Sequence, residues 1–127
     1  MSEDGISGLF RALVHVGTVE AVRQKYQVYR TAGGDFFVFS PSSRGTSSFH
    51  MTRVQAEKVE ALANVIGREE VTTGSLVKNG RLEEAFRAGE KLAMRFDLLM
   101  ALYVLVALGK VEMKKSGRSL VFSGRKG

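Results

Sequence analysis

Residues 90–108 form the segment that most restricts how this chain can fold. The residues from Leu98 to Leu108 are all apolar, but this run is too short for a membrane-spanning helix, which needs about 20 residues. The pattern predicts a buried helix over residues 90–108 that ends at Gly109. Because apolar side chains lie on more than one face of this helix, other elements must cover it on every side.

Two rows of apolar side chains lie on different faces of this predicted helix. The first row is Phe96, Leu99, Tyr103 and Val106, and the second row is Leu98, Leu102 and Leu105. A chain of 127 residues forms one domain, residues 1–127, and can hardly cover both rows itself. The commonest cover is the same helix of a second copy, so we expect a homo-oligomer, a dimer or larger, through the second row. The alternative is a central helix that its own domain wraps.

Two β-hairpins are expected, one in each half of the chain. Residues 25–31 and 35–40 are rich in aromatic and β-branched side chains. Between them, Gly33 and Gly34 supply the positive φ angles that a tight turn requires. Residues 110–115 and 118–123 form the second hairpin, because apolar and polar side chains alternate there.

Helices are expected at several further places, because apolar residues recur there at helical spacing. These are residues 6–14, 52–66 and 81–88, with a short helical turn over residues 18–24. Thr52 and Gln55 resemble a capping box at the start of the second helix. Residues 41–50 read as a loop, and residues 71–80 fit a short helix with loops. The chain is therefore predicted to be an α+β domain with two hairpins and about four helices.

Positive charge is concentrated near the C-terminus. The formal net charge is +6, and residues 101–127 hold six basic residues and one acidic residue, which gives +5 for this segment. A local positive field attracts phosphate backbones and other anions. We therefore favour an anionic partner over the alternative of a solvated tail that only aids solubility.

Aromatic side chains gather in the first hairpin and after it. Six of the eleven Phe and Tyr residues are Tyr26, Tyr29, Phe36, Phe37, Phe39 and Phe49. Basic residues are interleaved with them, a combination that suits single strands, because unpaired bases stack on rings while Lys and Arg contact phosphates. A two-residue turn at Gly33 and Gly34 places Arg30 opposite Phe37, which puts Tyr29 and Phe36 on one face as a stacking platform. The alternative is that both faces are covered.

These considerations define a predicted nucleic-acid-binding set. Its members are Lys25, Tyr29, Arg30, Phe36, Arg44, Phe49, Arg53, Lys114, Lys115 and Arg118.

No catalytic or metal-binding pattern is recognisable in the sequence. There is no cysteine, and His15 and His50 stand on separate elements without a carboxylate cluster beside them. No nucleophile elbow and no glycine-rich phosphate-binding motif is present. We expect no enzyme activity, no metal and no cofactor. The polar first residues do not form a signal peptide, which favours a cytoplasmic protein, and scarce Asn, Gln and Cys indicate a heat-adapted source.

Three segments carry a family resemblance: residues 26–30 (YQVYR), 36–39 (FFVF) and 98–102 (LLMAL). In this order, and with a basic, cysteine-free composition, the chain resembles the archaeal ThermoDBP-related single-stranded DNA-binding proteins. The resemblance implies a fold other than the OB-fold, binding of single strands in an aromatic cleft flanked by basic residues, and assembly through helices.

The expected function is therefore binding of single-stranded nucleic acid, in particular DNA, with little sequence preference. A winged-helix-like regulator of duplex DNA is the runner-up, with Lys114, Lys115 and Arg118 on its wing. The helix over residues 90–108 counts against it, because a recognition helix presents polar side chains to the groove. The third possibility is a protein-interaction module in which the basic tail has no role.

Overall fold

The computed structural model describes residues 13–21, 24–41, 49–87, 91–117 and 119–124. Most of the helix expected over residues 6–14 lies outside these ranges, and its last residue, Val14, begins a strand. The turn expected over residues 18–24 is wrong, because residues 18–20 belong to the same strand.

Four antiparallel strands form the larger sheet. They are β1 (Val14–Glu20), β2 (Lys25–Arg30), β3 (Phe36–Pro41) and β4 (Phe49–Val54). Their order in the sheet follows the chain, β1-β2-β3-β4, and the sheet stays open with β1 and β4 at its edges. The pairing of β1 with β2 is interrupted by a bulge between His15 and Gly17. An open four-stranded sheet is not a closed barrel, so the described part of the chain is α+β without barrel closure.

Four helices and a second hairpin follow the sheet. They are α2 (Ala56–Val65), α3 (Thr73–Leu76), α4 (Gly80–Phe86), α5 (Lys91–Ala107), β5 (Val111–Ser116) and β6 (Ser119–Gly124). The predicted α+β class is confirmed, and the described part of the chain includes the β2–β3 and β5–β6 hairpins. Gly109, with φ of 77°, follows α5, and Gly117, with φ of 61°, lies in the turn between β5 and β6. An isolated bridge joins Val71 to Phe122 on β6.

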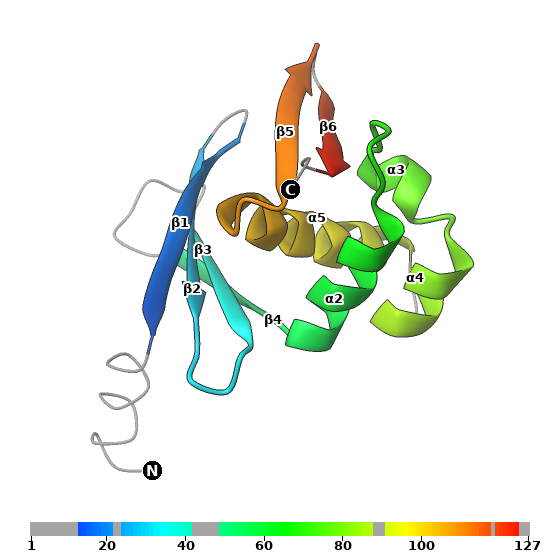
Figure 1. The fold of residues 1–127 in the computed structure, drawn as a ribbon. Coiled ribbons are helices and arrows are strands. Elements are labelled where there is room, and N and C mark those ends of the chain that lie inside the picture. The colour runs from blue at the N-terminus through cyan, green and yellow to red at the C-terminus, as the bar shows by residue number, and fades with distance from the viewer. Residues whose placement is uncertain (1–12, 22–23, 42–48, 88–90, 118, 125–127) are drawn as a thin grey trace.

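Helix α5 lies at the centre of the fold. Figure 1 shows the four-stranded sheet on one side of it, α2, α3 and α4 on the other, and the β5–β6 hairpin above it. Leu98, Leu102 and Leu105 are each 0% exposed within the single chain. They therefore cannot contact a second copy, and the predicted interface through them is wrong. The central-helix alternative is the correct one, while association of copies by another surface stays a prediction.

The β2–β3 turn is one residue longer than predicted, which changes the register. Thr31 N donates to Asp35 O at 2.9 Å, so three residues, 32–34, form the loop. Among the described residues of this turn only Gly34 has a positive φ, at 94°, whereas the two-residue turn with glycines at both central positions requires two. Arg30 consequently pairs with Phe36, and Tyr29 pairs with Phe37. A slip of one residue moves every β3 side chain to the opposite face.

Helix α2 begins later than predicted because residues 49–54 are a strand. Thr52 lies in β4 and pairs with Val38, so the expected capping box is wrong. The cap comes instead from the β2–β3 turn: Ala56 N donates to Asp35 Oδ1 at 3.0 Å. The same carboxylate accepts from Arg53 at the end of β4, at 2.5 Å. Asp35 therefore connects the hairpin turn, β4 and the start of α2.

Candidate nucleic-acid interface

The four-stranded sheet has a core face and an outer face. Phe36, Val38 and Val54 belong to the core beneath α5. Because side chains alternate along a strand, their neighbours point the other way. From the strand pairing, the outer face carries His15, Thr18, Gln27, Tyr29, Phe37, Phe39, Met51 and Arg53. In Figure 1 all the labelled helices lie on the core side of the sheet.

Three rings form a row across the outer face. The Tyr29 ring lies between His15, with centroids 5.1 Å apart, and Phe39, with centroids 5.3 Å apart in an edge-on arrangement. Gln27 Oε1 accepts hydrogen bonds from His15 Nε2 and Thr18 Oγ1, each at 2.8 Å. These bonds hold the imidazole beside the tyrosine. Tyr29 and Phe39 are half-buried, so part of each ring remains accessible.

Two other apolar side chains on the outer face, Met51 and Phe37, differ in how much of their surface is exposed. Met51 pairs with Phe39 and is 49% exposed. Phe37 is only 9% exposed, although it lies outside the cluster of buried residues around α5. Met51 is therefore available to a ligand, while the Phe37 ring is not.

Two cations flank the row, and both are already in ion pairs. Lys25 Nζ lies 3.4 Å from Glu20 Oε1, with both side chains about two-thirds exposed. Arg53 contacts Asp35, and its own side chain is 61% exposed. The hydrogen bond from Arg53, and next that from Ala56 N, hold the pKa of Asp35 below its ordinary value of 3.8. Exposed ion pairs are weak, so Lys25 can exchange its carboxylate partner for a phosphate. Arg53 exchanges less readily, because Asp35 also accepts a hydrogen bond from Ala56 N and is held in place.

Several predicted site residues lie elsewhere. Phe36 is 6% exposed and part of the core, so the predicted platform of Tyr29 and Phe36 is wrong. Arg30 is exposed, but its pairing with Phe36 puts it on the core side of the sheet. Arg44 and Arg118 lie outside the described residues, as does the side chain of Phe49.

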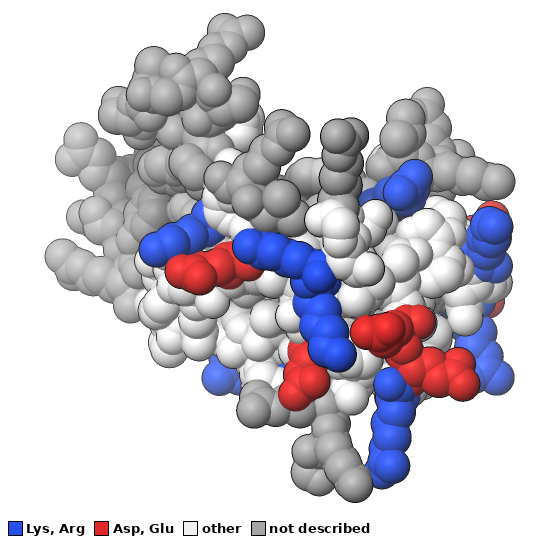
Figure 2. Space-filling view, turned by 90° about the horizontal axis from the view of Figure 1, so that it is seen from above, with Lys and Arg blue, Asp and Glu red and all other residues white. Residues whose placement is uncertain are grey.

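The two predicted lysines of the C-terminal hairpin are separate from the outer face. Lys114 and Lys115 are exposed and adjacent on β5, so they point to opposite faces of the hairpin. Lys114 Nζ lies 3.8 Å from Glu70 Oε2. Figure 2 shows basic and acidic side chains interspersed on the upper surface of the molecule. The described residues therefore form no continuous basic surface on this side.

Sequence reasoning missed the outer-face residues His15, Phe39 and Met51. It placed His15 directly after one predicted helix and Met51 directly before another, and it assigned Phe39 to the core through the one-residue register error. The spacing of the two glycines could not reveal the error, because the turn uses only one of them with a positive φ.

Comparison with known proteins identifies no relative. No protein-family model, no curated protein and no solved structure matches the chain. Among the residues that the structure describes, no group of three or more His, Cys, Asp or Glu could hold a metal ion. None of the described helices is long and apolar enough to cross a membrane.

Proposed function

We propose that the protein binds single-stranded nucleic acid across the outer face of the four-stranded sheet. The observation that carries this proposal is the row formed by His15, Tyr29 and Phe39 on the face opposite the core. Bases of a single strand stack on such rings, and each stacked base contributes about 1–3 kcal/mol. Stacking needs no particular base, so little sequence preference is expected.

The positions of Lys25 and Arg53 suit a strand that crosses the sheet diagonally. Phe39 pairs with Gln27 on β2 and with Met51 on β4. Lys25 lies two residues before Gln27, and Arg53 lies two residues after Met51. Because β2 and β4 run in the same direction, the two cations lie in opposite directions from Phe39 along the strands. From strand rise and spacing, their Cα atoms are roughly 17 Å apart. Phosphates on both sides of a base stacked at Phe39 could therefore each reach a cation.

Fluorescence anisotropy with single-stranded and duplex oligonucleotides of equal length, at two salt concentrations, tests this proposal. We expect tighter binding of the single strand, and an affinity that falls as salt rises. Tyr29→Ala should weaken binding by about 1–3 kcal/mol. Lys78→Ala, at an exposed lysine outside the sheet, is the control and should leave the affinity nearly unchanged. Absence of binding to either oligonucleotide at low salt would contradict the proposal.

A second candidate is duplex DNA binding by a winged-helix-like C-terminal half. It is favoured by the isolated bridge between Val71 and Phe122, which pairs a third segment of the chain with the β5–β6 hairpin that follows α5. Against it, every residue from Met100 to Leu105 is buried, so α5 cannot enter a groove along this part. Duplex binding as tight as single-strand binding would favour this candidate.

A further inference from the structure

A cavity of about 380 Å³ lies between α3, the first half of α5 and β6. Pockets that hold small molecules occupy roughly 300–1,000 Å³, so this cavity is large enough for one. Its polar lining comes from Arg95 and the hydroxyl side chains of Thr72, Thr73 and Ser119, and its apolar walls include Leu99 and Leu120.

The charge of this cavity is unbalanced. Among the described residues that line it, Arg95 is the only charged one. The guanidinium of Arg95 makes no ion pair or hydrogen bond with the described parts of the chain. An arginine that faces a cavity without a carboxylate favours an anion there, and its planar donors match phosphate oxygens in pairs.

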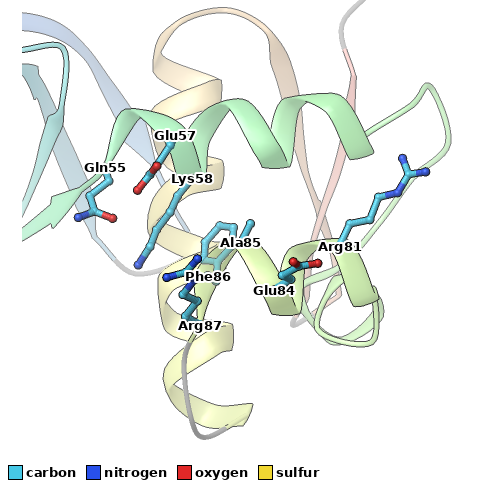
Figure 3. Close-up of a pocket in the computed structure, with 8 residues that line it drawn as sticks. All are labelled: Gln55, Glu57, Lys58, Arg81, Glu84, Ala85, Phe86 and Arg87. Carbon is cyan, nitrogen blue, oxygen red and sulfur yellow. The ribbon is translucent and has the colours of Figure 1, made fainter.

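A larger cavity of about 610 Å³ between α2 and α4 has a different composition. Figure 3 shows Lys58 and Arg87 close to the Phe86 ring, with Glu57 and Glu84 also lining the space. Its lining holds three cations and two carboxylates, so an anion in this cavity would also lie beside negative charge. Arg81, which points away from the other labelled side chains in Figure 3, provides a matched control for Arg95.

Two polar groups of the smaller cavity lie close to Gly74. A Cβ atom built on Gly74 would lie 3.7 Å from Thr72 Oγ1 and 3.9 Å from Arg95 Nη2. The missing side chain thus leaves open a position that both groups border. The donors to a ligand here are side chains, since the backbone N–H groups of Ser75 and Leu76 already bond to Thr72.

We propose that this cavity binds a phosphate monoester carried by an organic group, such as a nucleoside monophosphate. The phosphate would lie between Arg95 and the hydroxyls, above Gly74, because three hydroxyls and a guanidinium supply enough donors for its terminal oxygens. The organic part would contact Leu99 and Leu120. A free mononucleotide and the 5′ end of a nucleic-acid strand carry this same chemistry.

Titrations of the ¹⁵N-labelled protein followed by NMR test the proposal with adenosine 5′-monophosphate, adenosine and inorganic phosphate as probes. We expect the monophosphate to shift resonances of Gly74 and Ser119 and to bind at least about tenfold more tightly than adenosine, because adenosine cannot form the charge-assisted hydrogen bonds of the phosphate. Binding of adenosine as tight as that of its monophosphate would overturn the proposal, and so would no shift at these residues at millimolar concentration.

Two variants separate binding at this cavity from binding elsewhere. Gly74→Ala adds a methyl group at ordinary contact distance from its neighbours, so the fold should persist while the phosphate position is filled. Arg95→Gln removes the charge. Each should weaken monophosphate binding at least about tenfold, whereas Arg81→Gln should not. Unchanged affinity in Gly74→Ala refutes the proposal even if Arg95→Gln proves poorly folded.

Oligonucleotides with and without a 5′ phosphate distinguish the source of the ligand. A gain in affinity on phosphorylation that Gly74→Ala abolishes identifies the strand end, and binding of the mononucleotide without that gain identifies a free nucleotide. Both results support the cavity. The 5′-hydroxyl strand reports on the sheet alone, so the two proposals can fail separately.

Discussion

Phe36 and Phe39 lie on the same strand but on opposite faces, and replacing each by alanine separates packing from ligand binding. Phe36 is 6% exposed within the core. Truncating a buried phenylalanine costs about 3–5 kcal/mol. Phe39 is half-buried and meets Tyr29 edge-on, and such a pair contributes about 0.5–1.5 kcal/mol.

These free energies predict clearly different melting temperatures. A domain of this size loses about 4 °C per kcal/mol, so Phe36→Ala should melt roughly 12–20 °C below the parent protein and Phe39→Ala only a few degrees below it. In contrast, Phe39→Ala should weaken single-strand binding by about 1–3 kcal/mol. At a temperature where Phe36→Ala is still folded, its affinity should be close to that of the parent.

Thermal melts followed by circular dichroism, with anisotropy titrations on the same samples, provide both readouts. Equal destabilisation by the two substitutions would refute the assignment of the two faces. A Phe39→Ala variant that melts normally and binds with unchanged affinity would remove the sheet from the proposed interface.

Three further predictions follow from single residues. Asp35→Asn should destabilise the protein at pH 7. Because the pKa of Asp35 is lowered in the folded state, its contribution to the free energy of unfolding is present above pH 3.8 and disappears as the pH falls further. In urea unfolding, the difference in stability between the parent protein and Asp35→Asn should therefore be smaller at pH 3 than at pH 7. Leu102→Glu should abolish the helical circular dichroism signal, because the side chain is fully buried. A variant that stays folded but forms a smaller assembly than the parent protein would contradict this. Replacing Lys114 and Lys115 by Ala should leave the salt dependence of binding nearly unchanged, because both lysines lie on β5, away from the outer face; a slope flatter by about 0.7 for each lost phosphate contact would place them in the interface.

Local patterns were sufficient to predict the elements whose signals lie within a few residues. The apolar run before Gly109 predicted α5, and alternation around Gly117 predicted the β5–β6 hairpin. Strand β4 was missed because Thr52 and Gln55 resemble a capping box. It forms through pairing with β3, and no local pattern reports such a contact.

The candidate site was harder to predict than the fold, because its membership depends on register. Three residues of the predicted set, Lys25, Tyr29 and Arg53, lie on the outer face. One additional turn residue exchanged Phe36 for Phe39, and this exchange was enough to invert the predicted roles of both rings. The burial of Leu102 likewise depends on how many elements surround α5, which the helix sequence alone does not specify.

The bulge between His15 and Gly17 has a consequence for strand addition at the edge of the sheet. Strand β1 lies at an edge of the sheet, and an exposed regular edge is a template on which another chain can add strands and start a fibre. A bulge adds a residue without a partner and increases the local twist, so a straight incoming strand cannot stay in register past it. The irregularity beside the aromatic row thus makes this edge a poorer template for the addition of another strand.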